Sequence, residues 1–130
     1  MFNQTKITKT TGAAPVQILF NVQNQMAVSI KVDDGIASYV TENGRKIIKA
    51  GTPLSGDLED RSTAFAAVGQ SAPAVGILLH DVDITDGDAN GSLLIWGFVN
   101  LDRIDATTAA LITATVKTSL AGRVFFLKDN

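Results

Sequence analysis

The sequence predicts an α+β fold, namely a compact, mostly antiparallel β domain with one late helix. Short runs of β-branched and apolar residues recur along the chain and are separated by turn residues, a pattern typical of antiparallel strands. Only residues 106–120 have the apolar spacing of a helix, and strands do not alternate with helices along the chain. The 130 residues suit a single domain, and an apolar share of 45% is enough to form a core.

Residues 1–14 differ in composition from the rest of the chain. They are rich in Thr, Asn, Gln and Gly and offer few side chains to bury, chiefly Phe2 and Ile7. This composition predicts a flexible arm that is disordered when the protein is alone, although Thr favours an extended conformation once a partner is bound. The alternative is that residues 1–14 are a flexible terminus without a function. The β-rich domain is predicted to span residues 15–130.

The first half of the domain is predicted to consist of short strands joined by turns. Four β-branched or apolar runs are predicted strands: 16–22, 26–32, 36–40 and 45–49. Asn43-Gly44 separates the last two runs, and Asn-Gly between apolar runs is a strong hairpin signal. Asp33-Asp34-Gly35 and Gly51-Thr52-Pro53 are predicted turns. Residues 55–73 are predicted to form a loop with at most one short helical turn.

Two near-continuous apolar runs follow, 74–80 and 92–100, and both are long enough for buried strands. The polar segment 81–91 between them predicts a second hairpin. Gly76 and Gly97 lie inside these runs and indicate bulges or the close approach of another backbone.

A helix and a last strand are predicted at the end of the chain. Asp105 is placed to cap a helix over 106–120. Apolar residues recur there at helical spacing: Ala109, Ile112, Val116 and Leu120. Gly122 is a natural helix stop, and residues 124–127 form the predicted last strand.

Composition limits the classes of partner. The net charge of −2 argues against a nucleic-acid surface, because neutralising phosphates takes clustered Lys and Arg. The absence of Cys excludes disulfides and thiolate metal sites, so the chain can fold in a reducing cytoplasm. No apolar run approaches the ~20 residues that span a bilayer, and residues 1–12 lack the apolar core of a signal peptide. We therefore expect a soluble, unexported domain without a membrane partner.

The segment 86–91, Asp-Gly-Asp-Ala-Asn-Gly, is the sharpest local motif and matches the opening of a calcium-binding loop. The twelfth position of such a loop is a bidentate Glu, whereas here it is Gly97, so the coordination shell is incomplete. A turn made of residues that tolerate left-handed backbone is the favoured interpretation. No metal ion or cofactor is predicted.

His80 is the single histidine and adjoins Asp81 and Asp83. A histidine beside acids is a candidate general base or metal ligand. However, the sequence holds no second histidine, no G-x-S-x-G elbow and no Walker phosphate loop. A hydrogen-bonded histidine at a strand end is therefore favoured, and no catalytic residue and no enzymatic activity are predicted.

Trp96 and Arg103 are the candidate residues for a subunit interface. Trp is enriched at interfaces, but core packing is favoured for Trp96 because its neighbours are apolar. Arg103 would pair with an acid either across a subunit contact or as a solvated surface ion pair, and the surface pair is slightly favoured.

Several segments occur in a familiar order. They are the strand and turn 46–54, the Ala-Val-Gly-Ile-Leu-Leu run 74–79, the run 93–100, the helix after Asp105 and the terminal Val-Phe-Phe-Leu. Over roughly residues 36–130 this order resembles the head decoration proteins of tailed phages, of the kind found in phage lambda. The acidic segment 80–91 resembles decoration and head-fibre relatives more than the lambda protein itself.

The resemblance implies a β-tadpole-like homotrimer on local three-fold positions of the mature capsid, at the outer surface of the virion. It also implies that the arm becomes ordered there and adds a strand to the major capsid protein. The implied contact residues are Phe2, Asn3, Gln4, Thr5, Lys6, Ile7, Thr8 and Lys9. Fourteen extended residues reach at most ~50 Å, and three arms per trimer would act multivalently.

Two alternatives from other classes stay open. In one, the chain is the base module of a phage head or tail fibre, or an adhesin, whose loop 81–88 binds a ligand with or without calcium. In the other, it is a small hydrolase that uses His80.

Overall fold

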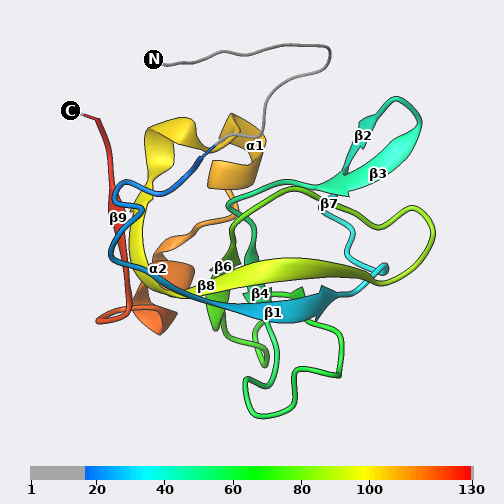
Figure 1. Ribbon diagram of the computed structural model, residues 1–130, viewed down its shortest axis with the longest axis horizontal. Coiled ribbons are helices and arrows are strands. Elements are labelled where there is room, and N and C mark those ends of the chain that lie inside the picture. Colours follow the sequence, from blue (N-terminus) through cyan, green and yellow to red (C-terminus); the bar gives the residue numbers. More distant parts are fainter. Residues whose placement is uncertain (1–16, 130) are drawn as a thin grey trace.

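The computed structural model, which describes residues 17–129, contains nine strands and three short helical segments in that range (Figure 1). The strands are β1 (Met26–Val32), β2 (Val40–Glu42), β3 (Arg45–Ile48), β4 (Pro53–Ser55), β5 (Ala66–Ala67), β6 (Gly76–Leu78), β7 (Val82–Asp83), β8 (Ala89–Asn100) and β9 (Val124–Leu127). The helical segments are the 3-10 helix η1 (Leu101–Arg103) and the α-helices α1 (Ala106–Ala109) and α2 (Ala114–Ser119). The predicted β-rich, mostly antiparallel class is confirmed. The predicted arm, residues 1–14, lies outside the described residues.

The long strand β8 organises the larger sheet, whose order is β1-β8-β6-β4-β5 with β9 also paired to β8. Residues 89–96 of β8 run antiparallel to β1, and Leu93 and Leu94 pair with β6. Residues 97–100 pair with β9, the only parallel pair of strands in the described region. A smaller sheet, β2-β3-β7, projects at the other end of the molecule, on the right of Figure 1.

The larger sheet buries apolar side chains on both faces. Leu93 belongs to one core cluster together with Phe65 and Ile48, whereas the adjacent Leu94 belongs to a second cluster under α2. A strand that is covered on both sides needs apolar residues at successive positions. This explains why residues 92–100 are near-continuously apolar and do not alternate.

Several predicted elements are confirmed. β1 spans the predicted 26–32 and β9 the predicted 124–127. Asn43 and Gly44 both have positive φ, 54° and 78°, as a two-residue hairpin turn requires. At Gly76 an added Cβ would lie 2.6 Å from the Leu94 carbonyl oxygen, so the predicted close backbone approach is also found.

Other predicted elements are wrong. From residue 17 onward, the predicted strand 16–22 makes only an isolated bridge between Leu19 and Val99. In the run 36–40 only Val40 belongs to a strand. The predicted loop 55–73 contains a short strand that the sequence did not predict, because β5 pairs there with β4. The predicted second hairpin is confirmed in the antiparallel pairing of β6 with β8, but the segment 81–91 is not a simple loop, because β7 pairs with β3 inside it.

The single predicted helix over 106–120 is two short helices. After α1, the amides of Leu111 and Ile112 donate to carbonyls three residues back, which tightens the turn. Thr113 then begins α2, and its hydroxyl accepts from the Val116 amide. Asp105 does occupy the cap position of α1, but its side chain makes no cap hydrogen bond. No helix in the described part of the chain is long and apolar enough to cross a membrane.

Candidate functional site

Large apolar side chains that remain exposed gather at one end of the molecule. Seven such residues occur among the described residues, and six of them flank the C-terminal half of β8: Phe20, Val22, Met26, Trp96, Phe125 and Leu127. Their exposed fractions lie between 38% and 55%. We call these six residues, together with the half-buried Phe98, the aromatic surface. The seventh, Tyr39, precedes β2 at the opposite end.

Aromatic side chains of the paired strands β8 and β9 form the centre of the aromatic surface. Phe98 and Phe125 are register partners on adjacent strands, and their rings stack with centroids 5.2 Å apart. Trp96 lies two residues before Phe98 and meets its ring edge-on, with centroids 5.8 Å apart. Three aromatic rings therefore form one continuous row across two strands. Core packing of Trp96, the favoured prediction, is wrong, since 41% of the residue is exposed.

The first described residues run along β8 on the side opposite β9. The Phe20 amide donates to the Phe98 carbonyl oxygen at 2.7 Å, and the Asn100 amide donates to the Ile18 carbonyl oxygen at 2.8 Å. This attachment brings Phe20 beside Phe98 and fixes one margin of the aromatic surface. It also means that the chain enters the domain next to this surface.

Arg103 holds the same segment in place. Its guanidinium donates to the carbonyl oxygens of Leu19 and Gln17, at 3.3 and 3.5 Å. Within residues 17–129 it forms no ion pair, so the predicted surface ion pair is wrong. Of the two predicted interface residues, Arg103 thus contacts the first described segment, whereas Trp96 pairs with Met26 and contacts Phe98.

β9 leaves an open sheet edge beside the aromatic surface. It pairs with β8 on one side and with no other strand of the described region, and it lies at the rim of the molecule in Figure 1. An unpaired edge presents free main-chain donors and acceptors to a partner. Phe125 and Leu127 project from this strand, so apolar side chains and free main-chain groups occur together.

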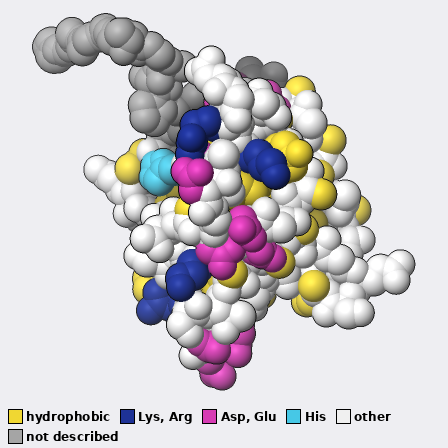
Figure 2. Space-filling view, turned by 90° about the vertical axis from the view of Figure 1, so that its right-hand side faces the viewer, with side chains coloured by type: hydrophobic (Ala, Val, Ile, Leu, Met, Phe, Trp, Pro, Cys, Tyr) yellow, Lys and Arg dark blue, Asp and Glu magenta, His cyan; other side chains and the backbone are white. Residues whose placement is uncertain are grey.

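The opposite end of the molecule is charged. Figure 2 faces this end and shows Lys, Arg, Asp and Glu side chains interspersed. Arg45 pairs there with Asp83 and Asp86, and Lys49 lies 3.0 Å from both Glu42 and Asp81. The hydrogen bond from Arg45 lowers the pKa of Asp83 to about 2, and the two carboxylates raise the pKa of Arg45.

The acidic loop 81–88 is tied to its surroundings by its own carboxylates. Asp81 accepts from Lys49 Nζ and from the Ala50 amide, while Asp83 and Asp86 pair with Arg45. The motif 86–91 does not fold as a calcium loop, because Ala89, Asn90 and Gly91 belong to β8. The favoured interpretation as a turn is confirmed by the hydrogen bond from the Gly87 amide to the Ile84 carbonyl oxygen.

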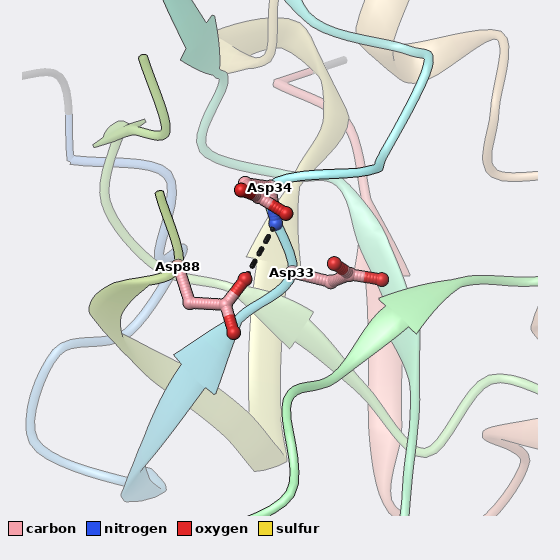
Figure 3. Close-up of side chains that lie close together, drawn as sticks. All are labelled: Asp33, Asp34 and Asp88. Carbon is pink, nitrogen blue, oxygen red and sulfur yellow. Dashed lines mark hydrogen bonds between the residues drawn. The ribbon is translucent and has the colours of Figure 1, made fainter. Parts of the chain in front are cut away.

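Asp33, Asp34 and Asp88 form an exposed carboxylate cluster (Figure 3), with one oxygen of each within 4.8 Å of the others. The Asp34 amide donates to Asp88 at 3.0 Å and so joins the turn after β1 to the start of β8. Desolvation and the two neighbouring carboxylates raise the pKa of Asp34. The three residues supply only part of the six to eight oxygens that calcium takes. Their separation in sequence hid this cluster from pattern analysis.

Two further features bear on the hydrolase alternative, namely His80 and an apolar groove. His80 is exposed after β6, and its side chain makes no hydrogen bond with another residue in the range 17–129. A groove of about 470 Å³ lies between α2 and the β4–β5 region, and none of the described residues lining it is charged. The groove therefore has no titratable pair of the kind a hydrolase needs.

A scan against protein-family models and a search of curated proteins found no match to the chain. The aromatic surface, with its open strand edge, is therefore the candidate functional site on physical grounds. Of the residues of the aromatic surface, the sequence pattern indicated only Trp96. The others were missed because they come from segments that only the fold brings together. Exposed aromatic residues gathered on one surface are typical of protein contacts.

Proposed function

We propose that this protein is a capsid-decorating protein of a tailed phage, which binds the outer surface of the mature head and stabilises it without catalysis. The order of segments over residues 36–130 supports the proposal, as does the β-rich, mostly antiparallel domain. In this proposal the domain is β-tadpole-like and acts as a homotrimer. The aromatic surface is the main structural support for the proposal, because a protein that functions by binding another protein needs an exposed apolar patch.

The proposed partner of residues 1–14 is the major capsid protein. A segment of Thr, Asn and Gln residues suits capture by a sheet edge, since main-chain hydrogen bonds supply the affinity and alternate side chains set the register. The proposed contact residues are Phe2 to Lys9. Because Arg103 and β8 fix residues 17–20 to the domain, the root of each arm has a defined position. Three weak arms on one trimer then sum to tight retention.

Co-sedimentation with mature heads tests this proposal. The heads are those built from the major capsid protein of the same genome, and the variants are the full chain and the chain lacking residues 1–14. We expect the full chain to pellet with the heads. The shortened chain should stay in the supernatant while keeping its circular dichroism spectrum and melting temperature. Equal pelleting of both chains would contradict the arm mechanism, and a full chain that ignores heads would contradict the function.

The fibre-base or adhesin alternative has less support from the site. Its ligand loop would use the carboxylates of residues 81–88, but Asp81, Asp83 and Asp86 are occupied by Lys49 and Arg45. Calorimetry with calcium and a glycan array separate the two functions. Saturable heat or glycan binding that Asp83→Asn abolishes would favour the adhesin.

A further inference from the structure

We infer that the aromatic surface is where one copy of this chain binds another, so that Phe20, Val22, Met26, Trp96, Phe125 and Leu127 are buried in the assembly. This inference deepens the proposed function, which requires a homotrimer without saying which surface forms it. The contact between copies does not itself depend on capsid binding, so each can be tested without the other.

The size of the surface fits a stable contact. A large apolar side chain buries roughly 150–250 Å² when it is fully covered, so the six exposed fractions amount to on the order of 500 Å². That lies near the upper end of the about 300–600 Å² that the largest apolar patch of a monomer exposes. A partner contributes about 800 Å² to a stable interface, so the six residues would form most of such a contact and their neighbours the rest.

The distribution of charge favours a second copy as the occupant. Residues 20–26, Phe-Asn-Val-Gln-Asn-Gln-Met, contain no charged side chain, and neither do residues 92–100. The ion-paired Lys, Arg, Asp and Glu residues lie at the opposite end (Figure 2). Two copies carry the same net charge of −2, and contact through an uncharged surface avoids placing like charges together.

The two margins of the aromatic surface are unlike each other, as in a closed ring of copies in which each copy contacts the next through a different patch. One margin is the open strand β9 with Phe125 and Leu127, and the other is the segment 20–26 with Phe20, Val22 and Met26. The row of Trp96 and Phe98 lies between them. Contacts between unlike patches close into rings when the rotation permits. We therefore place β9 of one copy against residues 20–26 of the next.

Trp96 allows a test on the unaltered protein, because it is the only tryptophan of the chain and lies in the centre of the surface. Fluorescence of the full chain is recorded from about 0.1 to 100 μM, a range that brackets micromolar dissociation constants. We expect the emission maximum to shift to the blue and iodide quenching to fall as concentration rises. An exposed, freely quenched Trp96 over the whole range would overturn the inference.

Single substitutions locate the contact. Val22→Asp changes a residue outside every helix and strand, so its folding risk is small, and Phe125→Asp changes the opposite margin. Tyr39→Asp is the matched control, because Tyr39 is exposed to a similar fraction, 38%, but lies at the charged end. Sedimentation velocity should show association weakened roughly 30-fold or more by each surface variant, because each places a charge in an apolar contact, and unchanged by the control.

Binding to mature heads is measured on the same variants, to separate failure of this inference from failure of the proposed function. A chain that associates through this surface but ignores heads supports the inference and contradicts the function. A chain that is monomeric at all concentrations, binds heads and loses that binding on Val22→Asp overturns the inference, since the surface would then contact the capsid protein. Association that all three variants leave unchanged overturns it as well.

Discussion

Gly76 is a residue where one added methyl group should lower the stability of the fold by a predictable amount. A Cβ there would lie 2.6 Å from both Leu93 Cγ and the Leu94 carbonyl oxygen. The carbonyl belongs to the central strand and cannot move freely, so Gly76→Ala should lower the free energy of unfolding by about 1–3 kcal/mol. Urea unfolding measures this. Gly69→Ala is the control, because no atom lies within 4 Å of its Cβ, and equal losses in both variants would contradict the packing.

Asp83 makes the charged end sensitive to acid. Its pKa is about 2 in the folded protein because Arg45 bonds to the carboxylate, compared with 3.8 for an unperturbed Asp. The stabilisation is therefore complete above about pH 4 and is lost as the pH falls through 2. Asp83→Asn should flatten the pH dependence of stability in this window, and ~1 M salt should shrink the difference between the proteins. A carboxyl titration by NMR with a midpoint near 4 would show that the ion pair is absent.

The burial and the contacts of individual side chains were what the sequence predicted least well. Trp96 lies in an apolar run and was expected in the core, yet the run emerges at the aromatic surface after Ile95. Arg103 was expected to find an acid, yet it donates to main-chain carbonyls. The outcome for Arg103 depends on residues 17–20 lying beside β8. No local pattern contains that contact, because more than 75 positions separate the two segments.

At the scale of elements, the break between α1 and α2 depends on Thr113. Its hydroxyl accepts from the Val116 amide at the start of α2, whereas Asp105 makes no such bond at the start of α1. Thr113→Ala should therefore lower the free energy of unfolding by about 1 kcal/mol. Asp105→Ala, the control, should stay within about 0.5 kcal/mol of the unaltered protein. Thermal unfolding compares them, and the reverse order of effects would contradict the assigned cap.

Elements with a strong local signal were predicted and those held by distant partners were not. The strand 26–32, the Asn43-Gly44 turn and the strand 124–127 each carry their own pattern. β5 and β7 have two residues each, too few for a periodic pattern, and they exist because β4 and β3 pair with them. The helical spacing over 106–120 was correct for burial of Ile112, Val116 and Leu120, but it did not reveal the turn between the two helices.

At the scale of the whole molecule, exposed large apolar residues gather at one end and the ion pairs lie at the other. The aromatic surface with the open edge of β9 lies at one end of the long axis, and the hairpin β2–β3 lies at the other (Figure 1). In the proposed assembly such a division would orient the protein, with the exposed apolar residues covered by a partner and the ion pairs left in water. The chain enters the domain beside the apolar end, so assembly and arm placement are geometrically linked.

Electron cryo-microscopy of mature heads incubated with the full chain tests the central claim most directly. We expect added density on the outer surface at the local three-fold positions, with three β-rich bodies in contact through their aromatic surfaces. A strand from residues 1–14 should continue each body into the major capsid protein. Bare shells at saturating protein concentration, or isolated single copies whose aromatic surfaces face solvent, would contradict the proposal.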